Sequence, residues 1–257
     1  MTISTPPGAR RSSARARPRW QIVPLGDRCL IVEFESRVDE AINRMARSLA
    51  QALLENPLAG VVDVVPAFCT VAVYYRPEEV MAAASSPPKA SPYQLLRARV
   101  AAVLEAGVDS TPGTARVVRV PVCYGANFGP DLEDVAAACS MSPQEVIQAH
   151  VESKHVVFML GFSPGFPYIG GLDPRLSVPR RMTPRTRIPA GTVAIARDQT
   201  AIYSYETPGG WNLLGRTPLR LFDPMAEPPC RLQAGDRIQF VPITPAQFEA
   251  SDPDAAS

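Results

Sequence analysis

The chain has 257 residues, of which 46% are hydrophobic, and its formal net charge is +1. A nearly neutral chain has no general electrostatic attraction to nucleic acid or to an anionic membrane surface, so neither is expected as a partner. No apolar run in the sequence approaches the ~18 residues that a membrane-spanning helix requires, and the length predicts two modest domains.

The first twenty residues differ in composition from the rest of the chain. They contain five arginines, no acidic residue, and Ser, Pro and Ala between them, which is typical of a disordered tail. The pair Arg10-Arg11 is not followed by the apolar region of an export signal, so the cytoplasm is the expected location. The five cysteines are never spaced as C-x-x-C and only two histidines are present, so neither a disulfide framework nor a metal site is expected.

Residues 21–114 are expected to form a small α+β domain. Its predicted elements, in chain order, are strands at 20–26 and 28–34, a helix from 38 to 56, two strands within 60–77 broken at Pro66, and a helix at 93–107. Pro57 ends the first helix, because proline cannot continue it. This order of elements predicts helices packed on one face of a sheet.

Residues 115–247 follow a different pattern, and 248–257 are expected to be a short tail. The predicted elements are a strand at 116–125, helices at 131–140 and 142–153, and short apolar runs at 191–196, 201–206, 218–223 and 236–243. Ser142 and Pro143, with Glu145 after them, match the start of a capped helix. Short apolar runs separated by Gly and Pro are typical of a closed or sandwiched β structure.

The stretch GFSPGFPYIGG at 161–171 contains the G-x-S-x-G pattern of a serine nucleophile on a turn between a strand and a helix. Its surroundings argue against that interpretation. Pro164 follows Ser163 and has no N–H for an oxyanion hole, and the glycines and prolines beyond it cannot form the helix that must follow. Both histidines precede Ser163, whereas this kind of triad has its histidine last. We therefore do not assign Ser163 as a nucleophile.

His150 is the first candidate for chemistry. It shares a predicted helix face with Val146 and Ile147. Two interpretations stay open: a buried histidine satisfied by one backbone hydrogen bond, or the best candidate for a catalytic base in a chain with two histidines. His155 begins a predicted strand and is the weaker candidate.

Four arginines form the second candidate, within eight residues of a segment stiffened by prolines: Arg180, Arg181, Arg185 and Arg187. Arginines on a rigid frame can present their planar forks to a carboxylate or phosphate, and the alternative is ordinary pairing in a solvated loop. The third candidate is YETPGGWNLLGRTP at 205–218. Here Trp211 supplies a flat apolar wall, and Arg216 and Thr217 supply hydrogen-bond donors.

The motifs GF-x-PGF, PRR-x-x-PR, PAG, PGGW and GRTP occur in this order between residues 161 and 218. Together they resemble the family of the 5-oxoprolinase B-subunit, also called the KipI or allophanate hydrolase subunit 1 family. The likeness covers nearly everything from Pro24 to Ile243 and omits the arginine-rich tail. Two positions depart from the family, which tends to have tyrosine at the place of His155 and glycine at the place of Arg197.

The resemblance implies an α+β fold made of a small ferredoxin-like N-terminal sandwich and a cyclophilin-like β-barrel. It implies one component of an ATP-dependent enzyme that opens the lactam of 5-oxoproline to glutamate, with a KipA-like C-subunit and a LamB/YcsF-like A-subunit as partners. ATP is then a cofactor shared with those partners, and Mg²⁺ is a candidate second cofactor. The chain has no recognisable nucleotide-binding loop, so it is expected to be inactive alone.

The family likeness also completes the set of expected site residues. The stretch 161–171 becomes a wall of the ligand cleft through Gly165 and Phe166, and His150 becomes the catalytic residue. Substrate or nucleotide is expected to bind to Arg180, Arg181, Arg185, Trp211, Arg216 and Thr217. Two other functions stay open, an inhibitor of a sensor histidine kinase and a component of a urea- or allophanate-type biotin-dependent enzyme.

Overall fold

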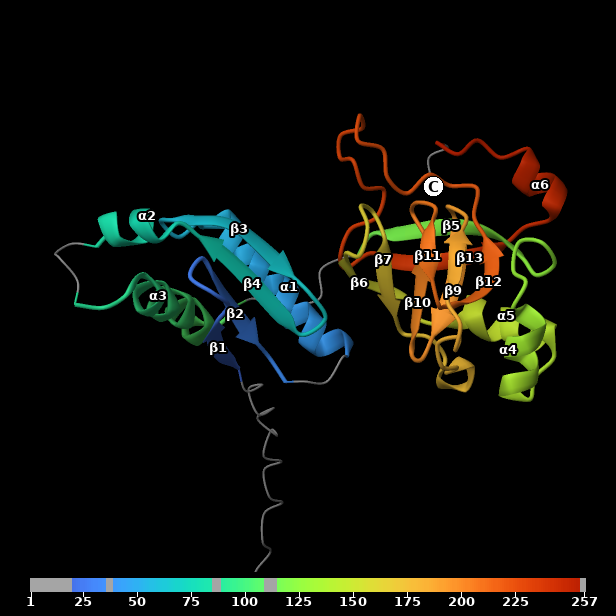
Figure 1. The fold of residues 1–257 in the computed structure, drawn as a ribbon, viewed down its shortest axis with the longest axis horizontal. Coiled ribbons are helices and arrows are strands. Elements are labelled where there is room, and N and C mark those ends of the chain that lie inside the picture. The colour runs from blue at the N-terminus through green and yellow to red at the C-terminus, as the bar shows by residue number, and fades with distance from the viewer. Residues whose placement is uncertain (1–19, 36–38, 85–88, 109–114, 255–257) are drawn as a thin grey trace, which may run out of the picture.

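The computed structural model describes residues 20–35, 39–84, 89–108 and 115–254, so most of the predicted arginine-rich tail lies outside the described residues. The chain forms two units that lie beside each other in Figure 1, a four-stranded sheet with helices and a closed barrel. The predicted mixture of helices and strands with a closed β structure in the second half is confirmed.

The N-terminal unit is an antiparallel sheet of order β1-β2-β4-β3. Its elements are β1 (Gln21–Pro24), β2 (Cys29–Glu33), α1 (Glu40–Glu55), β3 (Val61–Pro66), β4 (Thr70–Tyr75), α2 (Pro77–Ala82) and α3 (Pro92–Ala106). Asp39 begins α1 by accepting a hydrogen bond from the backbone of Ile42, and Asn56 ends it, as its position before Pro57 predicts. One face of α1 packs with the inward face of the sheet in a single apolar core, which includes Leu30, Val71 and Leu49.

The order of strands bears on the ferredoxin-like prediction. Strands β2, β3 and β4, with α1 between the first two, have the positions of the first three strands of that fold. The place of its last strand, beside the first, is taken by β1, which comes earlier in the chain than β2 and pairs antiparallel with it. The ferredoxin-like name therefore stays a prediction, related to the observed sheet by a circular permutation.

The second unit is a closed barrel of order β10-β7-β6-β13-β5-β12-β9. Its elements are β5 (Val117–Tyr124), α4 (Leu132–Cys139), α5 (Pro143–Glu152), β6 (Val156–Leu160), β7 (Pro167–Gly170), the 3-10 turn η1 (Pro174–Leu176), β8 (Arg185–Ile188), β9 (Thr192–Ala196), β10 (Gln199–Ile202), β11 (Thr207–Gly209), β12 (Asn212–Arg216), β13 (Arg237–Pro242) and α6 (Pro245–Glu249). Strands β5 and β13 pair in parallel and so join the two ends of this unit. Strands β8 and β11 form a separate two-stranded ribbon.

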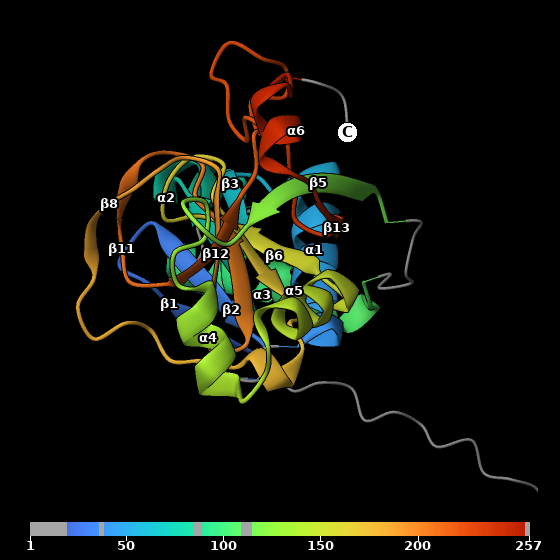
Figure 2. The ribbon, with the colours of Figure 1, turned by 90° about the vertical axis from the view of Figure 1, so that its right-hand side faces the viewer.

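Helices cover the two ends of the barrel. Helices α4 and α5 lie at one end and α6 at the other, which Figures 1 and 2 both show. The predicted start of α5 is confirmed, because Ser142 and Glu145 form a reciprocal capping box with Pro143 in the first turn. Thr244 and Gln247 cap α6 in the same way, and the chain then returns to the barrel, where the carbonyl of Pro253 accepts a hydrogen bond from the backbone of Arg220.

The two units are joined by a polar contact on α1. The amide nitrogen of Asn43, which is fully buried, donates to the carbonyls of Ala67 and Phe68 in its own unit and to that of Phe158 in β6, at 3.0, 3.2 and 3.0 Å. Phe68 stacks edge-on against Phe158, with ring centroids 6.3 Å apart. A second link runs from Arg237 to Glu40 at 2.9 Å. Contacts of this kind fix the orientation of α1 against the barrel.

Several local features differ from the sequence prediction, and three of them concern its stated elements or bounds. The run at 218–223 forms no named strand and contributes one isolated bridge, Phe222 to Cys230. Helix α2 was not predicted, although Pro77 followed by two glutamates is a helix-start signal. Trp20, assigned to the tail on composition, packs against the core of the N-terminal unit.

Candidate functional site

The predicted arginines meet at a carboxylate that the sequence prediction missed, Asp131. Its Oδ1 accepts from Nη1 of Arg181 and Nη2 of Arg185, both at 2.7 Å, and its Oδ2 accepts from Nη1 of Arg185 at 2.9 Å. The backbone N–H of Leu213 donates to the same Oδ2 at 2.8 Å. Asp131 is 1% exposed, so a buried carboxylate holds two cations and accepts four hydrogen bonds.

Asp131 stands immediately before α4, yet its side chain makes no hydrogen bond that caps this helix. It turns instead toward β12, where its own backbone N–H donates to the carbonyl of Leu213 at 3.1 Å. In the sequence it reads as one of several acids at the start of a helix. Its partners Arg181 and Arg185 are 50 and 54 residues away, so no local pattern reveals them.

Arg180 has a different environment from Arg181 and Arg185. It is exposed, and its guanidinium carbon lies 5.8 Å from the ring centroid of Trp211. The neighbouring backbone is held on both sides: Asn212 donates from its amide to the carbonyl of Pro179 at 2.9 Å, and Arg181 donates from its N–H to the carbonyl of Gly210 at 2.8 Å. The structure thus places Arg180 on a fixed backbone over an aromatic ring.

Phe166 and Trp211 are brought together in one buried cluster of the barrel. Their ring centroids are 6.4 Å apart, and both rings contact Tyr168, at 5.1 and 6.1 Å. Gly165 has φ +72°, and a Cβ there would lie 2.8 Å from Cβ of Phe222, so this turn requires glycine. Ser163 Oγ lies 3.2 Å from Ser204 Oγ, with no histidine among its hydrogen-bond partners in the described chain.

Arg216 and Thr217 do not join this group. Trp211 precedes the first residue of β12 and Arg216 is its last, so about 15 Å of extended backbone separates them. Arg216 donates to the carbonyl of Ala190 at 2.8 Å and lies over the ring of Phe248 in α6. Thr217 is 2% exposed and accepts from the N–H of Leu219 at 3.3 Å. The predicted binding residues therefore divide between two ends of one strand.

His150 is enclosed between α5 and the barrel wall. It is 0% exposed, its Nδ1 is 2.9 Å from the Tyr124 hydroxyl, and its Nε2 is 3.3 Å from the Thr200 hydroxyl. Burial first, and His155 second, hold the pKa of His150 well below its usual range. Both ring nitrogens face hydroxyl groups, and neither reaches a described cavity, so a catalytic role for His150 stays a prediction.

His155 lies beside it. Its Nε2 donates to the carbonyl of His150 at 2.7 Å, and the two ring centroids are 4.8 Å apart. Burial lowers the pKa of His155 to about 4, against a smaller opposing effect of that hydrogen bond. Arg197, the other departure from the family, has φ +55° in the turn between β9 and β10. This is the left-handed region that favours glycine, so a glycine would fit this turn with less backbone strain than Arg197.

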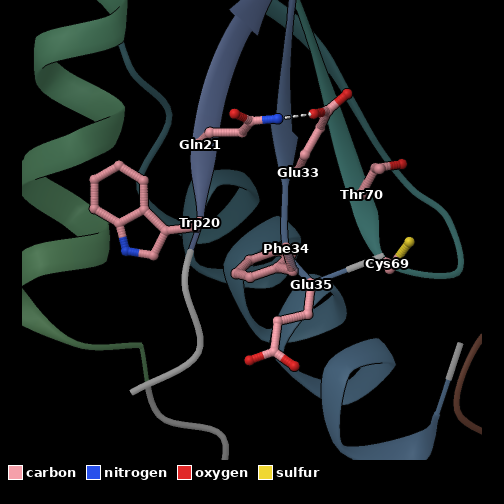
Figure 3. A pocket seen from close by; sticks show the side chains of 7 residues that line it. All are labelled: Trp20, Gln21, Glu33, Phe34, Glu35, Cys69 and Thr70. Atoms are coloured by element: carbon pink, nitrogen blue, oxygen red, sulfur yellow. Dashed lines mark hydrogen bonds between the residues drawn. The ribbon is translucent and has the colours of Figure 1, made fainter. Parts of the chain in front are cut away.

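Two cavities of about 620 Å³ lie elsewhere. The first is in the N-terminal unit, where Trp20, Phe34 and the carboxylates of Glu33 and Glu35 line it (Figure 3). The second lies on the barrel beside Arg116, Arg220 and the 222–231 loop. None of the predicted site residues lines either cavity. Within the described ranges no group of three His, Cys, Asp or Glu residues is placed to hold a metal ion, and no helix has the length and apolarity to cross a membrane.

Comparison with known proteins places this arrangement in a family. Residues 20–232 match the family called carboxyltransferase domain, subdomain C and D. A protein of Bacillus subtilis (strain 168), named as the B-subunit of 5-oxoprolinase, is 41% identical over 90% of this chain and 96% of its own. The solved structure of TTHA0988 has a TM-score of 0.70 and 37% identity over 84% of this chain, which spans 40% of that longer chain.

A further solved structure extends the fold to a larger enzyme. The K. lactis urea amidolyase has a TM-score of 0.71 over 91% of this chain and 15% of its own, at 19% identity, and this likeness shows the fold alone. The domain match covers most of the chain, and the identity to the Bacillus relative covers nearly all of both proteins. The chain therefore belongs to the family of the 5-oxoprolinase B-subunit.

Proposed function

We propose that the chain is the B-subunit of an ATP-dependent 5-oxoprolinase, which hydrolyses 5-oxo-L-proline to L-glutamate in the cytoplasm. The observation that carries this proposal is the 41% identity to a protein named as this 5-oxoprolinase component, over 96% of that relative. The proposal includes the finer fold names, a cyclophilin-like barrel and a permuted ferredoxin-like N-terminal unit. Histidine-kinase inhibition and urea- or allophanate-type chemistry remain alternatives, and no contact within the described residues favours them.

The proposed enzyme also contains a KipA-like C-subunit and a LamB/YcsF-like A-subunit. The relative's name describes one component of several, which supports an assembly. The geometry supports it as well, because the candidate residues divide between the two ends of β12, and the two cavities of about 620 Å³ lie away from them. An ATP-coupled hydrolysis needs its reactants held together and screened from bulk solvent, in a more enclosed site than these described residues form. The partners would supply the remaining walls.

ATP and Mg²⁺ are part of the proposal, and the described residues do not fit them as a complete site. Arg181 and Arg185 already donate to Asp131, and no described group of three His, Cys, Asp or Glu residues could hold the ion. We therefore derive no step of the reaction through the nucleotide. Binding of the nucleotide is assigned to the complete assembly.

Reconstitution tests the proposed function. The purified chain is expected to release no glutamate from 5-oxoproline and ATP when it is alone, and to support turnover when both partners are added. The measurement is glutamate release with and without ATP, with each pair of components as the control. Full turnover by the isolated chain contradicts the need for partners, and absence of turnover by the complete assembly contradicts the proposed function itself.

A further inference from the structure

The four arginines between 180 and 187 differ in what they pair with. Arg181 and Arg185 share the carboxylate of Asp131, and Arg187 pairs with Glu206 at 2.7 Å. Arg180 has neither an ion pair nor a side-chain hydrogen bond with any described residue, and its charge contact is the ring of Trp211. Three arginines of the segment are therefore in ion pairs, and Arg180 is the one that is not paired with an acid among the described residues.

The backbone on both sides of Arg180 is fixed by hydrogen bonds. The carbonyl before it and the N–H after it are both hydrogen-bonded to the Gly210–Asn212 segment, which contains Trp211. On the C-terminal side of this anchor, Arg181 and Arg185 hold the loop to Asp131, which is itself hydrogen-bonded to Leu213. Arg180 and its aromatic platform thus belong to one rigid frame, a condition for precise ligand binding.

The chemistry of this pair selects a class of ligand. A guanidinium that lies over an indole ring and has no protein acceptor can present its planar fork of N–H groups to the two oxygens of a carboxylate. The same aromatic cluster offers apolar surface to a small ring where it reaches the outside, at the half-buried Tyr168 beside Trp211 and at Phe162, which is 65% exposed and packs on Phe166. A compact cyclic acid such as 5-oxoproline has both of these parts.

We infer that Arg180, which lies over Trp211, binds the carboxylate of a small cyclic acid, and that Asp131 is a positioning residue that holds the frame through Arg181 and Arg185. This inference rests on the proposed function for the identity of the acid. It assigns different roles to arginines that the sequence treats alike, since only Arg180 touches ligand. Arg181 and Arg185 act on the ligand through the position of the loop.

The test uses the complete assembly and compares Arg180→Ala with Arg187→Ala, a matched variant of an ion-paired, exposed arginine in the same segment. Arg180→Ala is expected to raise KM for 5-oxoproline about ten- to a hundredfold with little change in kcat, because a charge-assisted contact to the bound acid is lost. Arg180→Lys keeps the charge and should recover part of the loss. Arg187→Ala should match the wild type.

Asp131 is tested as a positioning residue by a double-mutant cycle. Asp131→Asn is expected to raise KM several-fold in the wild-type background and to add little in the Arg180→Ala background, because both changes act on the same contact. A purely structural role would give equal effects in the two backgrounds. Equal KM values for Arg180→Ala and Arg187→Ala in an active assembly overturn the inference and leave the proposed function standing.

A binding measurement keeps the inference testable without turnover. In the full chain with Trp20→Phe, Trp211 is the one remaining tryptophan of the sequence. Its fluorescence is expected to respond to 5-oxoproline and not to 2-pyrrolidinone, which lacks the carboxylate, and the response should vanish in Arg180→Ala. A response that survives in Arg180→Ala, or is equal for the two compounds, overturns the inference. Absence of both response and turnover in the wild type counts against it and against the proposed function together.

Discussion

Asp131→Ala is expected to lower the free energy of unfolding by about 2–3 kcal/mol, the upper range for hydrogen bonds to a charged group, because the two guanidinium groups left behind are 34% and 26% exposed and water can reach them. Asp131 is 1% exposed, and its loss leaves the guanidinium groups of Arg181 and Arg185 and the N–H of Leu213 without their acceptor. Urea unfolding at pH 7 measures the change. Arg185→Ala should also destabilise the chain, because Asp131 then loses two of its hydrogen bonds.

Glu206→Ala is the matched control for this prediction. Glu206 also pairs with an arginine of the same segment, Arg187, but the two side chains are 46% and 76% exposed. An exposed pair contributes about 0–1 kcal/mol, so this variant should stay close to wild type. If Asp131→Ala changes stability no more than Glu206→Ala does, the buried network does not hold the 178–185 loop.

Lowering the pH from about 7.5 to about 5 is expected to destabilise the chain through its two histidines. Burial lowers the pKa of His155 to about 4 and that of His150 well below 6.5. Well above pH 6.5 both histidines are neutral in the folded and in the unfolded chain, so they do not change the free energy of unfolding with pH. Below it the unfolded chain takes up protons that the folded chain does not, so stability falls, by about 2 kcal/mol at pH 5 for His155, and His150 contributes in the same direction.

His155→Gln measures the part of this pH dependence that comes from His155. Glutamine can still donate toward the carbonyl of His150, as His155 does through Nε2 at 2.7 Å, and it does not titrate. The loss of stability over the same pH interval should therefore be smaller by about 2 kcal/mol in the variant than in the wild type. The comparison uses urea unfolding at the two pH values. An unchanged difference would mean that His155 is protonated in the folded chain at the lower pH.

The elements of the fold were predictable where their signals are local. The cap of α5 at Ser142, the end of α1 before Pro57 and the strand break at Pro66 each follow from neighbouring residues. The pairing of strands that closes the barrel was not, since β5 and β13 pair in parallel although Val117 and Arg237 stand far apart in the sequence. Alternation of apolar residues indicates a strand and gives no partner for it.

The site was predictable to a smaller extent. The residue types were identified, and Arg180, Trp211 and Phe166 do lie together. The sequence does not show that the buried carboxylate of Asp131 pairs with Arg181 and Arg185. This pairing depends on where the loop before α4 meets β12. The distance from Trp211 to Arg216 likewise follows from the intervening strand, since adjacent motifs in sequence need not be adjacent in space.

Asn43 connects α1 by hydrogen bonds to both units and so restricts their relative rotation. One amide group donates to carbonyls of both units, so a rotation of either unit by more than a small angle breaks the hydrogen bond to Phe158 and leaves a buried carbonyl unpaired. Movement between the units is resisted by this bond and by the ion pair of Arg237 with Glu40, while the Asn43 amide stays bonded to Ala67 and Phe68. Phe158 lies in β6, the strand that leads directly into the turn of Gly165 and Phe166, so Asn43 connects the N-terminal unit to the strand that precedes the aromatic cluster around Trp211.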